Sequence, residues 1–171
     1  VVTPRHPDKI CDRISDAILD ACLEQDPDSR VAIETMGGHG IITVTGELTT
    51  KAFVDVSEVV KSVYGRDIGV QTNIVRQSPE IAQGVDTGGA GDQGIMIGYA
   101  CNDNEEYVPQ EYYLARKLAQ HIYEKYPYDG KTQVTMNGNS LRVVASFCCT
   151  PTNILKDLVV EFFDQYPDYR I

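Results

Sequence analysis

The fold of this 171-residue chain is constrained most by a pattern that occurs twice. Each copy consists of an amphipathic helix, two short β-branched runs around a glycine-containing turn, and a second helix. The copies share no obvious residue identity, so the repeat is one of pattern only. Helices that alternate with hairpins predict an α+β fold, in which small sheets are covered by helices.

Only the first copy is extended by additional strands. In and after this copy, the predicted elements are a helix over residues 8–24, strands over 31–35 and 41–45, a helix over 50–64, and strands over 70–75 and 95–99. In the second, they are a helix over 111–126, strands over 132–136 and 141–147, and a helix that starts at 151–153. The second copy lacks the two extra strands, so we expect further sequence or another chain to complete it.

A polar break at residues 102–106 separates the copies and predicts two domains, over residues 1–101 and 107–171. Apolar faces without a cover predict self-association.

The composition argues against several classes of protein. A net charge of −10 is unsuited to nucleic acid, which needs clustered Lys and Arg. No apolar run approaches the roughly 20 residues of a membrane span. Five cysteines, an odd number without C-x-x-C spacing, indicate buried reduced thiols in a cytoplasmic protein rather than a zinc site or a disulfide framework.

A glycine-rich loop at residues 88–94 is the segment that most suggests a ligand site. Four glycines surround Asp92 and Gln93, and an apolar run comes directly after them. Glycines allow positive φ and close approach of the backbone to a ligand. The pattern is typical of a grip on a small charged molecule.

His6, Asp8 and Lys9 stand at the start of the first predicted helix, where free N–H groups and the helix dipole favour phosphate. His6 could donate to a developing anion, Asp8 could hold a metal ion, and Lys9 could reach phosphate oxygens. On spacing alone, an ordinary helix start explains these residues better.

Other polar residues also have plain structural explanations. Glu34 fits a solvent-facing strand position, Glu47 precedes a helix cap at Thr49 or Thr50, and Lys131 comes after the turn at Asp129. None of them alone favours function over structure.

Together, however, four ordered segments resemble the methionine adenosyltransferase, or S-adenosylmethionine synthetase, family. They are HPDKICDRISDA at residues 6–17, QSPEIAQGV at 77–85, GAGDQG at 89–94 followed by IGYA at 97–100, and DGKTQVT at 129–135. The resemblance covers essentially the whole chain, and four such segments in the expected order are far more specific than any one of them.

The resemblance implies an activity. The family joins ATP and L-methionine: the methionine sulfur attacks C5′ of the ribose, and the released triphosphate is hydrolysed to phosphate and diphosphate. Mg²⁺ and K⁺ assist. The fold has three similar domains, and the active site lies at the subunit interface of a homo-oligomer.

The resemblance also implies residue roles. His6 and Lys131 would be catalytic, and Lys9 and Asp129 would join them in binding ATP. Asp8 would hold magnesium and Glu34 potassium. Methionine would be held by Glu47, Gln83 and Asp92.

Three departures from the family pattern bear on activity. Pro4 and Arg5 stand where the family usually has an acidic residue and a glycine, and the loop before residue 89 is short. The family's later phosphate-binding segments are missing, so we expect this chain to need the remaining part for turnover. The alternatives are a binding or assembly module of the same fold without turnover, and an unrelated α/β domain, which the ordered motifs disfavour.

Overall fold

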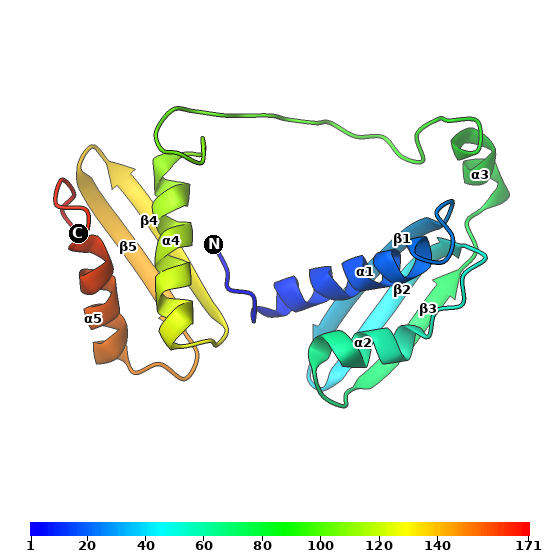
Figure 1. The fold of residues 1–171 in the computed structure, drawn as a ribbon, viewed down its shortest axis with the longest axis horizontal. Helices are drawn as coiled ribbons and strands as arrows, with labels where there is room; N and C mark the ends of the chain where they lie inside the picture. The colour runs from blue at the N-terminus through cyan, green and yellow to red at the C-terminus, as the bar shows by residue number, and fades with distance from the viewer. The chain divides into compact units, whose positions relative to one another are not determined.

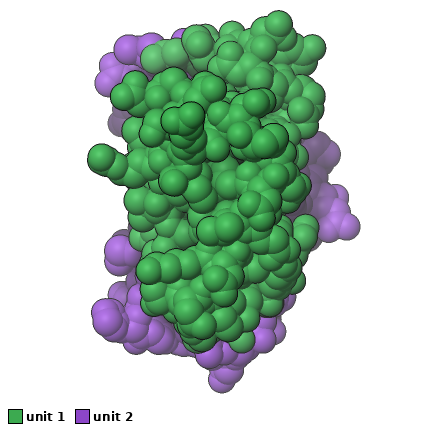
Figure 2. All heavy atoms as spheres, turned by 90° about the vertical axis from the view of Figure 1, so that its left-hand side faces the viewer, with its two compact units in different colours: residues 1–9, 97–171 green, residues 10–96 purple.

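The computed structural model describes residues 1–171 and divides into two compact units (Figure 2). Unit 1 consists of Val1–Lys9 and Ile97–Ile171, and unit 2 of Ile10–Met96. The sequence patterns contained no sign that the first nine residues belong with the second half of the chain. No helix combines the length and the apolar character needed to cross a lipid bilayer.

Unit 2 contains a three-stranded sheet with helices on one face (Figure 1). Its elements in chain order, counting the helix that begins at the unit boundary, are α1 (Pro7–Leu23), β1 (Arg30–Gly38), β2 (Ile41–Thr49), α2 (Val56–Tyr64), β3 (Gly69–Val75) and α3 (Pro79–Val85). The strand order is β1-β2-β3, with β1 antiparallel and β3 parallel to β2. The predicted first helix and hairpin are confirmed. His39 and Gly40 form the hairpin turn with φ of 50° and 85°, as the tightest hairpins require.

The core of unit 2 reflects the helical periodicity of α1 and the two-residue periodicity of the strands. Helix α1 buries Ile14, Ile18 and Cys22 along one stripe, and β2 buries Ile42 and Val44 at alternate positions. The other face of the sheet carries no helix of this unit and contains exposed residues such as Met36, which is 70% exposed.

The second helix begins six residues later than predicted, at Val56. Residues 51–53 are held in another conformation, because Asp26 accepts the N–H of Lys51 at 2.8 Å and Gln25 exchanges two hydrogen bonds with Phe53. Asp55, rather than Thr49 or Thr50, caps the helix by accepting from the Glu58 N–H. Phe53, an apolar residue within the range predicted as helix, is therefore 87% exposed.

The strand predicted over residues 95–99 is wrong. Ile95, Met96 and Ile97 pair with no strand and are 89–93% exposed. An apolar run with β-branched residues forms a strand only by pairing with a neighbouring strand, and this run pairs with none. The prediction also missed α3, although Ser78 and Pro79 carry its start signal: Ser78 Oγ accepts the Ile81 N–H, and proline occupies the first turn.

Unit 1 contains a hairpin covered on one face by two helices. These are α4 (Gln110–Lys125), β4 (Gly130–Asn137), β5 (Ser140–Phe147) and α5 (Thr152–Phe163) (Figure 1). All four elements were predicted to within a few residues. The inward side chains of the hairpin, among them Val134, Leu141 and Phe147, meet Leu118 and Phe162 of the two helices in a single core.

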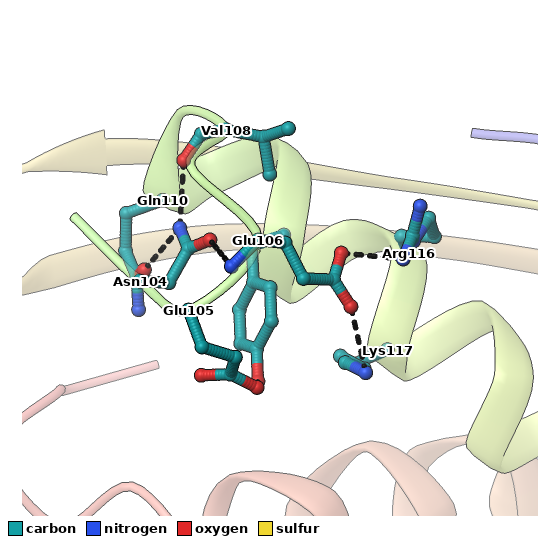
Figure 3. A network of polar contacts seen from close by, with 8 residues as sticks. Asn104, Glu105, Glu106, Val108, Gln110, Arg116 and Lys117 are labelled. Atoms are coloured by element: carbon teal, nitrogen blue, oxygen red, sulfur yellow. Dashed lines mark hydrogen bonds and ion pairs between the residues drawn. The ribbon is translucent and has the colours of Figure 1, made fainter. Parts of the chain in front are cut away.

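The polar break before α4 is tied to that helix by side chains (Figure 3). Glu106 forms ion pairs with Arg116 and with Lys117, the latter at 2.9 Å. Tyr113 donates its hydroxyl to Glu105 at 2.8 Å, and this bond, with burial as the second cause, raises the tyrosine pKa to about 12. The domain limits 1–101 and 107–171 remain predictions.

All five cysteines are free. Cys22 is buried, and burial together with nearby Asp26 raises its thiol pKa. The expectation of buried thiols is wrong for Cys148 and Cys149, which are exposed where the chain leaves β5.

Candidate active site

The predicted site residues fall into two sets, one in each unit. The residues expected to contact ATP or magnesium all lie in unit 1: His6, Asp8, Lys9, Asp129 and Lys131. The residues expected to contact methionine or potassium all lie in unit 2: Glu34, Glu47, Gln83 and Asp92.

The unit 1 set is brought together by the first three residues, which extend the hairpin at the edge of β4. Val1 exchanges two hydrogen bonds with Thr132, at 2.9 and 3.0 Å. Thr3 donates its N–H to the Gly130 carbonyl (2.9 Å), accepts the Gly130 N–H on Oγ1 (3.0 Å) and donates that hydroxyl to Tyr128 (3.0 Å). Thr3 is 1% exposed. These hydrogen bonds fix the segment before His6 to Gly130, the residue between Asp129 and Lys131.

A tight turn leads from Thr3 to His6. The His6 N–H donates to the Thr3 carbonyl at 3.0 Å, so Pro4 and Arg5 occupy the two central positions. Proline at the first of these presets the φ that the turn needs. Arg5 does not have a positive φ, so the turn requires no glycine where the resemblance leads one to expect it.

His6 is 8% exposed and has a defined hydrogen-bonding state. Its Nδ1 accepts the Asp8 N–H at 3.2 Å, so the proton of the neutral ring is on Nε2. The Asp8 carboxylate lies 3.6 Å from the same Nδ1, and its side chain is 80% exposed. The ring is thus held by its own helix start and offers Nε2–H as a donor.

Asp129 has an acceptor that nothing in the chain satisfies. Its Oδ1 is buried and has no hydrogen-bond partner, although its backbone carbonyl accepts the Cys148 N–H at 2.9 Å. A buried acceptor without a partner costs about 1–3 kcal/mol, which a ligand donor such as a hydroxyl would offset. Lys131, one residue past Gly130, is exposed on the face of the hairpin opposite the helices.

Gly130 itself is required by packing. A Cβ at this position would lie 2.4 Å from the ring of Phe147. The glycine between Asp129 and Lys131 therefore reflects close contact with the core, whereas the sequence pattern indicated turn chemistry.

The unit 2 set begins with two carboxylates on the open face of the sheet. Glu34 pairs with Thr45 and Glu47 with Ala32, so the two glutamates are diagonal neighbours on adjacent strands. Such pairs lie roughly 7–8 Å apart, a spacing at which both can attract one cation. Glu34 is exposed and solvent-facing, as its alternation predicted.

Gln83 belongs to a helix that is fixed near the same edge of the sheet. Strands β2 and β3 are parallel, and α3 begins four residues after β3 ends. The Gln77 N–H donates to Thr49 Oγ1 at 3.3 Å, and Arg30 at the start of β1 lies 3.7 Å from Asp86. The end of β2 that carries Glu47 and the helix that carries Gln83 are therefore neighbours.

The glycine-rich loop divides into two parts with different roles. Gly89 donates to the Gly84 carbonyl (3.0 Å) and Gly88, with φ of 86°, to the Val85 carbonyl (2.9 Å), which is the Schellman arrangement that ends a helix. Asp92 lies beyond it in exposed chain, and its carboxylate accepts only the neighbouring Gln93 N–H at 2.7 Å. The structure brings Glu47 and Gln83 to one region but forms no contact between Asp92 and either of them.

The chain alone does not assemble a complete metal site. No group of three His, Cys, Asp or Glu side chains is placed to hold a metal ion. Mg²⁺ on a nucleotide needs only one or two carboxylates besides phosphate and water, so exposed Asp8 fits that role. A cavity of about 480 Å³ next to Lys9 is lined by the N-terminal segment and by Tyr112, Arg116 and Tyr123 of α4; His6, Asp129 and Lys131 do not line it.

Comparison with known proteins gives one consistent family. Residues 1–85 match the model of the S-adenosylmethionine synthetase N-terminal domain, and residues 87–147 match that of the central domain. Among curated relatives, the S-adenosylmethionine synthase of Clostridium tetani is 45% identical over 170 residues, covering 79% of this chain and 44% of the relative. That of Nocardioides sp. is 44% identical over 170 residues (79% and 43%), and that of Brachyspira hyodysenteriae 40% over 181 (84% and 46%). The chain spans less than half the length of these relatives.

Proposed function

The chain belongs to the S-adenosylmethionine synthetase family, and on this premise we propose that it provides ATP- and methionine-binding residues of a methionine adenosyltransferase. The reaction is ATP + L-methionine + water → S-adenosylmethionine + phosphate + diphosphate. The sulfur of methionine forms a bond to C5′ of the ribose while the C5′–oxygen bond to the triphosphate breaks.

The observation that carries the proposal is the bonding of Thr3 to Gly130. It joins two segments 127 residues apart, and these are the segments that hold the residues expected to contact one ligand. Thr3 is buried and makes three hydrogen bonds at this junction, so the two segments are held together in the free chain.

The chemistry asks little of a general base, because a thioether sulfur carries no proton. The protein must align sulfur with C5′ and stabilise the charge that develops on the leaving triphosphate. His6 suits the second task, since its Nε2–H can donate a hydrogen bond to a phosphate or bridging oxygen. Lys131 would contribute positive charge, and the Asp129 carboxylate would accept a ribose hydroxyl.

The family implies metal cofactors, and Asp8 is the residue whose exposure and position suit Mg²⁺ bound through phosphate. When bound, the ion neutralises charge on the triphosphate. Glu34 would face K⁺, and Glu47, Gln83 and Asp92 would surround the methionine ammonium and carboxylate groups. Since the Asp92 segment is exposed in the free chain, we expect the ligand to order it.

We also propose homo-oligomers and a cytoplasmic location. The open face of unit 2 carries Met36, Ile41 and Val75, which are 45–70% exposed and would be covered by a second copy. The five free cysteines suit a reducing compartment. An alternative function, a binding or assembly module without turnover, is favoured by one observation: Asp92 has no contact with Glu47 or Gln83.

The experiment that separates the two functions supplies the chain with ATP, L-methionine, Mg²⁺ and K⁺ and measures S-adenosylmethionine and phosphate, alone and with the remaining family domains added. Product in the completed assembly, lost in His6→Asn, supports the transferase. Binding of both substrates without product in either sample supports the module. Absence of substrate binding in both samples refutes the transferase and the binding module.

Asp92→Asn tests the methionine site separately. Removing the carboxylate should weaken methionine binding in the completed assembly about tenfold, because a charge-assisted contact to the ammonium group is lost. Asp103→Asn is the matched control, since Asp103 is exposed in unit 1. Equal methionine affinities of the Asp92 variant and the wild type, measured by calorimetry, would remove Asp92 from this site.

A further inference from the structure

The turn before His6 holds an arginine that no part of the proposed mechanism uses. Arg5 is exposed at the third position of the Thr3–His6 turn, and no hydrogen bond or ion pair holds its guanidinium. Its backbone, by contrast, is fixed on both sides, since Thr3 is anchored to β4 and the His6 N–H closes the turn. The backbone of Arg5 is thus fixed, while its guanidinium is unengaged.

The neighbouring charges leave a task for such a cation. A nucleoside triphosphate carries about four negative charges. The unit 1 set offers two lysines, Lys9 and Lys131, and contains two carboxylates, Asp8 and Asp129. A guanidinium can bind two phosphate oxygens at once through its planar fork, which an ammonium cannot. Arg5 is next to His6 in the chain, so it lies beside the donor proposed to face the leaving triphosphate.

We propose that Arg5 is a further binding residue of this site and that its ligand is the polyphosphate part of the nucleotide. The inference rests on the proposed function and adds to it a specific role for a residue outside the family pattern. Thr3 is the positioning residue for this contact, because its hydrogen bonds to Gly130 and Tyr128 set where the turn projects.

The test is a titration of the 171-residue chain with inorganic tripolyphosphate and Mg²⁺, followed by amide NMR shifts and calorimetry. Arg5→Ala should weaken binding about tenfold, and Arg5→Lys should recover only part of the loss, since it restores charge but not the fork. Arg170→Ala is the control: Arg170 is the same residue type in the same unit, but its backbone bonds to Asn139 and Leu141 at the other end of the hairpin. The affinity of this control variant should equal that of the wild type.

Three results would overturn the inference, and they differ in what else they affect. If Lys131→Ala weakens binding but Arg5→Ala does not, Arg5 is excluded while the proposed function stands. If Arg170→Ala weakens binding as much as Arg5→Ala, the loss comes from the reduced net charge of the chain and not from a contact made by Arg5. If the wild-type chain shows no shift at residues 3–9 or 129–131, both the inference and the placement of the nucleotide in unit 1 fail. Circular dichroism of each variant confirms folding.

Discussion

The two sheets of this chain share a layout but expose opposite charges. In each, one face is covered by helices and buries apolar residues, while the other face is open. The open face of unit 1 carries Lys131 and Arg142, and that of unit 2 carries Glu34 and Glu47. The repeated pattern therefore fixes only the scaffold. The few alternate positions that face away from the core set the charge of each open face.

The units also differ in how their candidate residues are held. His6 is 8% exposed and lies next to a segment anchored by buried hydrogen bonds, whereas Asp92 lies in a stretch in which every residue from 90 to 100 is exposed. The glycine-rich segment, which has the stronger sequence signal, is therefore the less fixed of the two.

The largest effect expected is from Gly46→Ala in β2. A Cβ there would lie 2.0 Å from the Ala32 carbonyl oxygen, and the residue has φ of 137°. Steric overlap and backbone strain together should lower the free energy of unfolding of unit 2 by at least about 3 kcal/mol. Denaturant unfolding followed by amide NMR would show the loss in unit 2 signals first. Gly38→Ala, where a Cβ would meet nothing within 4 Å, is the control; an equally large effect there would contradict the argument.

Thr3→Val tests the anchor of unit 1. It leaves the Gly130 N–H and the Tyr128 carbonyl without their hydroxyl partner, at a cost of about 1–3 kcal/mol. Hydrogen exchange of the Gly130 and His6 amides should accelerate, while Thr3→Ser should retain most of the protection. Unchanged exchange in the valine variant would show that backbone pairing alone holds the segment.

A crossed pair of substitutions tests the charge difference between the open faces. Lys131→Ala should weaken ATP binding about tenfold and leave methionine binding unchanged in the completed assembly; Glu47→Gln should do the reverse. Calorimetry with each substrate separates the two effects. A variant that weakened the binding of ATP and of methionine equally would contradict the assignment of one ligand to each face.

The smallest effect expected is a pH dependence confined to unit 1. The pKa of Tyr113 is raised from its ordinary 10.0 to about 12, with the bond to Glu105 as the main cause. A raised pKa stabilises the protonated form in the folded state, so this contribution is complete below pH 10 and is lost as the pH rises toward 12. Tyr113→Phe should remove that alkaline loss, measured as unfolding midpoints between about pH 9 and pH 12. Persistence of the same loss in the variant would assign it to other groups.

Much of the fold could be predicted because it rests on local pattern. The stripe that contains Ile14 and Ile18 and the alternation of Ile42 and Val44 both predict burial directly. Two of the failures depend on contacts or pairings that the local pattern does not specify, whereas α3 was missed despite its local start signal at Ser78 and Pro79. The late start of α2 depends on Asp26, and the run at Ile95 has no strand to pair with.

The candidate site shows the same limit. The identities of His6, Asp8 and Lys131 came from ordered motifs, but no motif indicated Thr3, because its role depends on partners 125–127 residues away. The roles of Gly88 and Gly130 were likewise misjudged: Gly88 ends α3 through local backbone hydrogen bonds, and Gly130 is required by its tertiary contact with Phe147.

The bond between Thr3 and Gly130 also sets an order of events during synthesis. All of unit 2 lies between the two segments that form unit 1, so a ribosome completes it first. At roughly 5–20 residues per second, Thr3 waits on the order of 6–25 s for its partner to be made. Until then the segment that carries His6 lacks Gly130, to which Thr3 anchors it. The nascent chain therefore acquires the sheet that carries Glu34 and Glu47 well before it can place its histidine.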